Sequence, residues 1–175
     1  MRITISGPPG SGTSTLAHYL AAHHGYELIS AGEVFRMLAR ERGMELAAFG
    51  KLAESDPSVD RSIDARQKEI GEARDNIAIE GRLSGWMVGN ADLKIWVCAP
   101  LDIRAERIAD REGIPVDTAR ALTLERESCE AERYRSYYDI EIDDLSPYDL
   151  VLSSEKWGRE ALGRIVDTAI ACLYR

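Results

Sequence analysis

The sequence contains no apolar stretch long enough to cross a membrane as a helix, so we expect no membrane association. A strand-like apolar run begins at residue 3, which leaves no room for a secretory leader. The three cysteines, Cys98, Cys129 and Cys172, are far apart and form no C-x-x-C pair, which argues against a disulfide framework and against a zinc site. We therefore expect a cytoplasmic protein with free thiols.

The chain also has fewer basic than acidic residues. The chain has 22 Lys and Arg residues against 30 Asp and Glu residues, which gives a formal net charge of −8 at pH 7. This balance argues against broad binding to nucleic acid, and any anionic ligand must be held by local arginines and helix N-termini. Internal repeats, low-complexity tracts and linkers are lacking as well, so we expect a single domain over residues 1–175 that acts as a monomer.

The sequence near the N-terminus resembles a phosphate-binding loop that lacks its usual lysine. The alternative is that this segment is a glycine-rich turn that binds no ligand. After the apolar run at residues 3–6, the motif G-x-x-x-x-G-K-S/T is matched by Gly7, Gly12 and Ser14, with Thr13 at the lysine position. Glycines allow backbone N–H groups to converge on phosphate oxygens, and the next helix presents its positive N-terminus to the same anion. The Ser14 hydroxyl could ligate the Mg²⁺ ion that bridges the phosphates. The predicted phosphate-binding residues are Gly7, Pro8, Pro9, Gly10, Ser11, Gly12, Thr13, Ser14 and Thr15.

Short apolar segments alternate with helical patterns along the whole chain. This alternation predicts an α/β fold with a five-stranded parallel sheet covered by helices on both faces. Ser30 and Glu33 form a capping box at one helix start, and Asp56 and Asp117 are expected to cap two later helices. The expected strands are residues 3–6, 27–29, 76–80, 93–98 and 149–152. The expected helices are residues 14–24, 30–43, 45–54, 56–74, 101–111, 117–137 and 158–174.

Several candidate functional segments follow expected strands, and in an open α/β sheet a ligand sits at the carboxyl ends of the strands. The phosphate loop, Ser30, the run 80–82 and the run 153–154 therefore converge on one edge. Glu80 can hold Mg²⁺ through water, and Arg82 can bind an acceptor phosphate with its guanidinium fork. Arg36 points to the same acceptor from the helix that opens at Ser30. The alternative for the run 80–82 is an ordinary strand end with a salt bridge.

Two sets of arginines flank a helix break at residues 113–115, each set on one helix face. Taken alone, the pattern favours two surface helices linked by salt bridges. A phosphate loop without its lysine, however, needs cations from elsewhere, and this favours a lid that closes over the loop. The sets are Arg104, Arg107 and Arg111 before the break, and Arg126 and Arg133, with Glu130 between them, after it.

Five segments occur together in one order and spacing: residues 7–15, 30–36, 80–82, 104–107 and 126–134. In this arrangement the chain resembles the cytidylate kinases over its whole length, and the compact archaeal type is the most similar. The resemblance implies the nucleoside monophosphate kinase fold, with a P-loop core, a monophosphate-binding region at residues 31–75 and a lid at residues 105–135. It also implies that ATP, with Mg²⁺ as cofactor, phosphorylates CMP or dCMP to CDP or dCDP.

The resemblance implies roles for individual residues. The phosphate loop and Arg104 would bind ATP, while Ser14 and Glu80 would hold the metal. The implied CMP-binding residues are Ser30, Gly32, Arg36, Asp60, Arg61, Asp64 and Arg82. The implied catalytic residues are Arg126, Arg133 and Arg82. Two alternatives stay open: a kinase for AMP, UMP or another small metabolite, and a non-catalytic nucleotide-binding protein, which would need no acceptor arginines.

Overall fold

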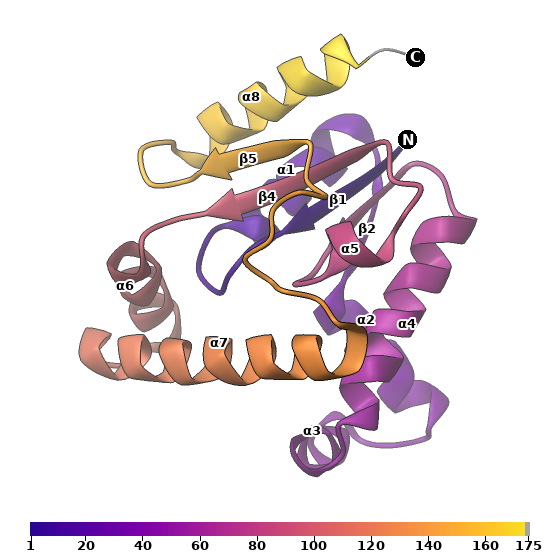
Figure 1. Cartoon of the computed structure of the whole chain (residues 1–175), viewed down its shortest axis with the longest axis vertical. Helices are drawn as coiled ribbons and strands as arrows, with labels where there is room; N and C mark the ends of the chain where they lie inside the picture. The colour runs from indigo at the N-terminus through magenta and orange to yellow at the C-terminus, as the bar shows by residue number, and fades with distance from the viewer. Residues whose placement is uncertain (174–175) are drawn as a thin grey trace.

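A computed structural model of the chain describes residues 1–173, apart from the side chains of residues 54 and 55, and contains a five-stranded parallel sheet (Figure 1). The strand order is β2-β3-β1-β4-β5, so the N-terminal strand lies in the centre. Ile5 of β1 pairs with Glu80 of β3 on one side and with Ile95 of β4 on the other. The strands are Arg2–Ser6 (β1), Glu27–Ser30 (β2), Ile77–Glu80 (β3), Leu93–Cys98 (β4) and Leu150–Ser153 (β5). The predicted fold class is confirmed.

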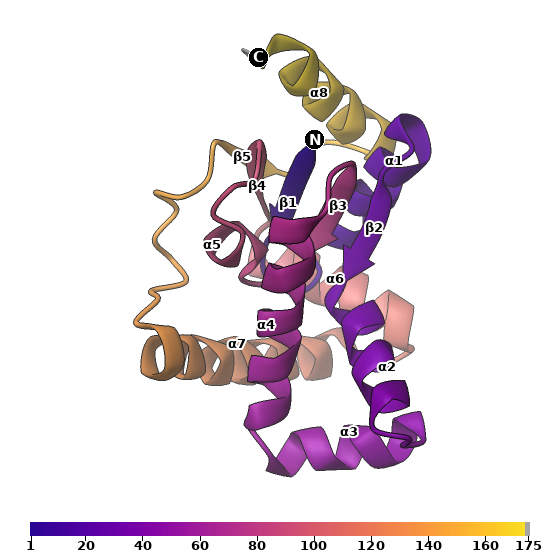
Figure 2. The ribbon, with the colours of Figure 1, turned by 90° about the vertical axis from the view of Figure 1, so that its right-hand side faces the viewer.

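Helices cover both faces of this sheet and extend beyond its carboxyl edge. Helices α1 and α8 lie together on one face, and α2, α3 and α4 form a lobe beyond β2 and β3 (Figure 2). Helix α7 crosses below the carboxyl ends of the strands (Figure 1). The bounds are Thr13–His24 (α1), Ala31–Glu41 (α2), Leu46–Ser55 (α3), Ser58–Ala73 (α4), Ser84–Met87 (α5), Leu101–Glu112 (α6), Val116–Tyr138 (α7) and Arg159–Cys172 (α8). In the described part of the chain, no helix has both the length and the apolar character needed to cross a membrane.

Two separate apolar clusters hold the sheet and the lobe. The first packs α1 and α8 against β1 and β4, with Ile5, Leu20 and Val166 among its buried members. The second joins α2, α3 and α4 to β2 and β3 around the fully buried Phe49 and Val59. The second cluster therefore anchors the lobe on β2 and β3, on the side of the sheet edge away from β5. The two clusters thus fix the surfaces that meet at the carboxyl edge.

Most local signals in the sequence act as expected. Ser30 accepts a hydrogen bond from the N–H of Glu33, whose carboxylate accepts one from the N–H of Ser30, so the capping box is confirmed. Asp56 accepts a hydrogen bond of 2.9 Å from the N–H of Ser58, where α4 begins. Strand β4 has the expected bounds, and the other strands agree to within one residue at either end.

Three expectations differ from the structure. Asp117 does not cap α7, because the helix begins at Val116, directly after Pro115. Asp117 instead lies in the first turn, where its negative charge interacts favourably with the positive end of the helix dipole. The short helix α5 was not expected, since four residues are too few to show a helical period. Two helix bounds also differ by two residues, since α2 ends at Glu41 rather than at Gly43 and α4 begins at Ser58 rather than at residue 56. Tyr174, the expected end of the last helix, lies outside the described residues.

Candidate active site

The phosphate loop connects β1 to α1 in a conformation that only glycine adopts easily. Gly10 and Gly12 have φ angles of 76° and 100°, in the left-handed region. Helix α1 begins directly at Thr13, and its N-cap residue, Gly12, has no side chain to cap the first N–H groups. Open N–H groups at a helix N-terminus attract anions, so the loop has the geometry of a phosphate site.

Thr13 and Ser14 both turn toward Glu80 at the end of β3. The Thr13 hydroxyl donates to Glu80 Oε1 at 2.7 Å, and the Ser14 hydroxyl donates to the same oxygen at 3.2 Å. Hydroxyl and carboxylate oxygens are the ligands that Mg²⁺ prefers, so Ser14 and Glu80 fit the cofactor expected here. Among the described residues, no three His, Cys, Asp or Glu side chains gather as a metal cluster, so a bound ion would take most of its ligands from phosphates and water.

A cavity of about 440 Å³ opens between α2, α4 and α7, and Arg82 on its wall reaches the carbonyl of Gly7 in the loop. The cavity contains both carboxylates and guanidinium groups, which suits a ligand with a phosphate and a polar base. Six of the residues expected at the acceptor or catalytic site line it: Gly32, Asp60, Asp64, Arg82, Arg126 and Arg133. The remaining lining residues are Ala31, Phe35, Ile63, Gln67, Cys129, Glu130 and Tyr134.

Glu130 joins two of the catalytic candidates. Arg82 Nε donates to Glu130 Oε2 at 2.8 Å, and Arg126 Nε donates to Glu130 Oε1 at 2.8 Å. Arg82 Nη1 also donates to the carbonyl of Gly7, at the start of the phosphate loop. Glu130 is buried, and a buried negative charge needs a partner; the two arginines provide it. One carboxylate therefore holds two guanidinium groups between the loop and the cavity.

Two further contacts connect the acceptor lobe to α7. Arg133 forms an ion pair of 2.7 Å with Asp60, and the Tyr138 hydroxyl donates to Asp64 at 3.0 Å. Burial raises the pKa of Asp64 to about 6, the negative charge of Asp60 adds to the shift, and the Tyr138 hydrogen bond and Arg133 oppose it. Asp64 is thus a carboxyl group that changes its protonation state near pH 6.

Four expected site residues lie away from the cavity or are engaged elsewhere. Arg36 is exposed on α2, and its Nη1 atom lies beside Gly32. The guanidinium of Arg61 lies over the ring of Tyr137, 5.1 Å from its centre. Ser30 uses its hydroxyl oxygen for the helix cap.

Arg104 is the fourth of these residues, and its donors face protein groups. Only 7% of the residue is exposed. Its Nε donates to the carbonyl of Ala99 at 2.9 Å, and its Nη1 donates to the carbonyl of Pro9 at 3.1 Å and to Glu127. In this conformation Arg104 supports the phosphate loop, and its contact with ATP stays a prediction.

Sequence reasoning missed Gln67, a buried residue that is 3% exposed on the cavity wall. Its Nε2 donates to the carbonyl of Glu80 at 2.8 Å, and a Cβ on Gly81 would lie 2.7 Å from its Oε1. Gln67 therefore fixes the backbone that carries Glu80 and Arg82, and a glycine is needed beside it. Gln67 lies three residues after Asp64 on α4, and this spacing could have placed both residues on the same helix face.

Comparisons with known proteins give consistent results. A model described as the cytidylate kinase-like family matches residues 2–156. A cytidylate kinase of Methanoculleus marisnigri is 71% identical over 175 residues, which cover 100% of this chain and 97% of that protein. A cytidylate kinase of Pyrococcus abyssi is 51% identical over 172 residues, covering 98% of this chain and 94% of that protein.

Solved structures share the fold at low sequence identity. An uncharacterized protein from Eubacterium ventriosum superposes with a TM-score of 0.74 at 17% identity, covering 97% of this chain and 98% of that one. A shikimate kinase from Bacteroides thetaiotaomicron superposes with a TM-score of 0.66 at 11% identity, covering 98% of both chains. These likenesses concern the fold alone, whereas the sequence relatives match from end to end. On that ground, and with the phosphate loop and its neighbouring cavity in place, this chain belongs to the cytidylate kinase-like family.

Proposed function

We propose that this protein transfers the γ-phosphoryl group of ATP to CMP or dCMP and releases ADP together with CDP or dCDP. The observation that carries the proposal is the position of Arg82, which reaches from the carbonyl of Gly7 in the phosphate loop to Glu130 in the cavity wall. A single cation can therefore meet donor and acceptor phosphates. Relatives named cytidylate kinase, at 51% and 71% identity, support cytosine as the base.

The reaction needs no nucleophilic side chain. A phosphate oxygen of CMP bonds to the γ-phosphorus while the bond from that phosphorus to the β–γ bridging oxygen breaks, and the electron pair leaves with ADP. Catalysis then consists of positioning and of charge stabilisation. Arg82, Arg126 and Arg133 would take this role by exchanging Glu130 and Asp60 for phosphate oxygens.

The donor side of the proposal is the phosphate loop with its cofactor. Residues 7–15 would bind the phosphates of ATP, with Ser14 and Glu80 beside the Mg²⁺ ion. The bound ion would neutralise charge on the β- and γ-phosphates. Arg104 would act on the same side.

The acceptor side is the cavity between the lobe and α7. Asp64, as a carboxylate, would accept a hydrogen bond from the cytosine amino group, which uracil lacks. Asp60 and Arg61 are further candidates for the base, and Arg36 would meet the phosphate after its exposed side chain turns inward. Residues 31–75 would thus form the acceptor region and residues 105–135 the lid, in a monomer. The three cysteines are free, which fits action in the reducing cytoplasm.

An acceptor screen tests the proposal. ADP release from ATP is followed with CMP, dCMP, UMP and AMP in turn, and the binding of each monophosphate is measured in parallel. We expect kcat/KM to be highest for CMP and dCMP. A higher kcat/KM for AMP or UMP would refute the choice of base, and ATP binding without any phosphoryl transfer would support the non-catalytic alternative.

A further inference from the structure

Side chains from outside the phosphate loop bind three of its carbonyl oxygens in succession. Arg104 Nη1 donates to Pro9 at 3.1 Å, Arg107 Nη1 donates to Gly10 at 3.2 Å, and the Ser154 hydroxyl donates to Ser11 at 2.6 Å. The loop is therefore held from behind, that is, at its carbonyl groups, by α6 and by the segment after β5.

Arg107 differs in its charge balance from the arginines that line the cavity and from Arg104. Its guanidinium donates to the carbonyl of Gly10, to the Ser154 hydroxyl at 2.8 Å and to the Ser154 carbonyl at 2.8 Å. Among the described residues, no carboxylate lies within ion-pair distance of it. Arg82, Arg104, Arg126 and Arg133, in contrast, each pair with a glutamate or an aspartate.

Position 13, where a phosphate loop usually has its lysine, cannot supply this charge. Thr13 is neutral, and its hydroxyl is bound to Glu80 at 2.7 Å. A guanidinium bound to a peptide carbonyl makes the nearby potential more positive and polarises that peptide unit. Arg107 is half-buried, so water screens its charge less than it would on an open surface.

We propose that Arg107 supplies, from behind the loop, the positive charge that Thr13 leaves out, and so acts as a positioning residue for the donor phosphates. Ser154 holds the guanidinium in place through its hydroxyl and its carbonyl. The inference rests on the proposed binding of ATP to the loop. It extends that proposal to a residue outside the loop motif and outside the acceptor cavity.

The test measures the Kd of ATP·Mg²⁺ without any acceptor, and the KM values of ATP and CMP, for Arg107→Gln and Arg107→Ala. Gln keeps a hydrogen-bond donor and loses the charge. We expect both variants to raise the Kd and KM of ATP about 10–100-fold and to change the KM of CMP by less than about twofold. Arg107→Lys should recover part of the affinity, since it keeps the charge without the fork.

The matched control is Arg164→Ala, which removes an exposed arginine on α8, outside the phosphate loop, the lid and the acceptor region. It should leave the Kd of ATP unchanged. A merely structural role for Arg107 predicts a lower melting temperature with normal ATP affinity in the folded fraction, and that result would overturn the proposal. If the Ala variant fails to fold, the Gln and Lys variants decide between the two outcomes.

A second variant shows whether positions 13 and 107 share one task. Thr13→Lys should improve ATP binding more in the Arg107→Gln background than in the wild-type background, because one cation partly replaces the other. An equal effect in both backgrounds would refute the shared role. Since Kd is measured without an acceptor, a protein that binds ATP through Arg107 but phosphorylates no monophosphate would refute the proposed function alone.

Discussion

At the scale of single residues, the two arginines expected on the acceptor phosphate have very different surroundings. Arg82 is held between Gly7 and Glu130, whereas Arg36 is exposed on α2. Arg82→Ala should lower kcat and also raise the KM of CMP, because it removes a charge-assisted contact of about 1.5–3 kcal/mol at the transferring group. Arg36→Ala should raise the KM of CMP with little change in kcat.

Steady-state kinetics with each substrate varied in turn check this pair of expectations. The KM of ATP is the internal control for Arg36→Ala and should stay at the wild-type value. A variant of Arg36 that weakens ATP alone would assign this residue to the donor side.

Asp64 predicts a pH dependence of acceptor binding. Its pKa is raised to about 6, mainly by burial, so the carboxylate that would accept from the cytosine amino group becomes protonated as the pH falls through 6. We expect the KM of CMP to rise between pH 7.5 and pH 5. The phosphate of CMP itself titrates near pH 6, at about its ordinary pKa, and Asp64→Asn is therefore the control. The part of the pH dependence that Asp64→Asn retains belongs to the phosphate.

The same shift has a defined sign for stability. The pKa of Asp64 is higher in the folded state than in the unfolded state, so its contribution to stability is fully present below pH 3.8 and is lost as the pH rises through 6. Relative to the wild type, Asp64→Asn should therefore gain free energy of unfolding between pH 4 and pH 7, by at most about 3 kcal/mol. Urea unfolding at several pH values measures this difference, and a constant difference would contradict the shift.

At the scale of elements, the start of α2 combines a capping box with an expected acceptor contact. Ser30→Ala removes the acceptor for the N–H of Glu33, so the free energy of unfolding should fall by about 1 kcal/mol. Ser30→Asp keeps a good cap and should preserve stability. If Ser30 also binds CMP through its hydroxyl proton, both variants raise the KM of CMP, and an unchanged KM would limit Ser30 to the cap.

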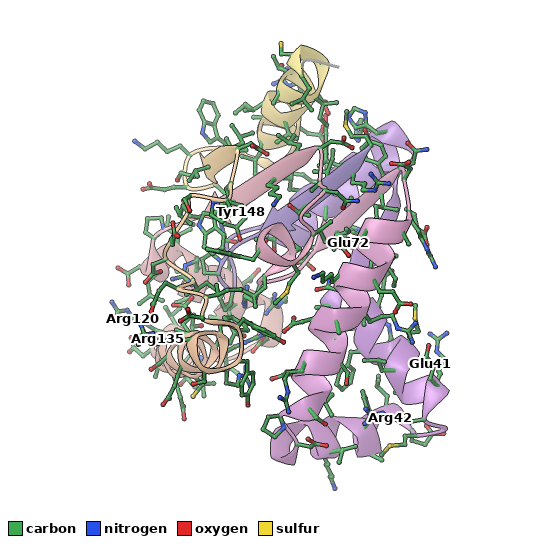
Figure 3. All side chains as sticks on the ribbon, turned by 45° about the vertical axis from the view of Figure 1, so that its right-hand side comes forward. Glu41, Arg42, Glu72, Arg120, Arg135 and Tyr148 are labelled. Atoms are coloured by element: carbon green, nitrogen blue, oxygen red, sulfur yellow. The ribbon has the colours of Figure 1, made fainter. Side chains whose placement is uncertain are left out.

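Helix α7 carries the expected lid arginines. Arg126→Ala and Arg133→Ala should each lower kcat by about 10²-fold, because these charges act mainly as the phosphoryl group moves. Arg135→Ala provides the control on the same helix, since Arg135 is exposed and pairs with Glu141 (Figure 3). Rapid-quench measurement of a single turnover separates this effect from product release. Unchanged rates would show that Arg126 and Arg133 have no catalytic role and only form surface ion pairs.

The elements also show why some features could be predicted and others could not. Glycine spacing in the phosphate loop and the Ser30 capping box are local signals, and the apolar runs identify the strands. Helical spacing placed Arg104, Arg107 and Arg111 on one face, but how deeply each is buried depends on how α6 packs against the loop. Arg61 rests on Tyr137 from another helix, which no local pattern encodes. Gln67 belongs to no motif, and its role follows from its contact with β3.

At the scale of the whole molecule, substrate binding should stabilise the fold, because both proposed sites join separate elements. A ligand at 100 times its Kd adds about 2.7 kcal/mol, which for a chain of this size corresponds to a rise in melting temperature of about 5–10 °C. ATP·Mg²⁺ and CMP should each produce such a rise in differential scanning fluorimetry. A free nucleoside, which lacks the phosphate, should produce a much smaller rise, and an equal rise would contradict the role of the arginines.

The central position of β1 has a consequence for how the protein is made. The phosphate loop leaves the ribosome before its supports do, because Arg82, Arg107 and Ser154 follow their loop partners by 75, 97 and 143 residues. Such distant pairings form late, after most of the chain is available. A nascent chain therefore carries the loop sequence long before it has the loop's supports. The ability to capture ATP should therefore appear only after Ser154 has left the ribosome and reached Ser11, so a shorter nascent chain does not bind the nucleotide tightly.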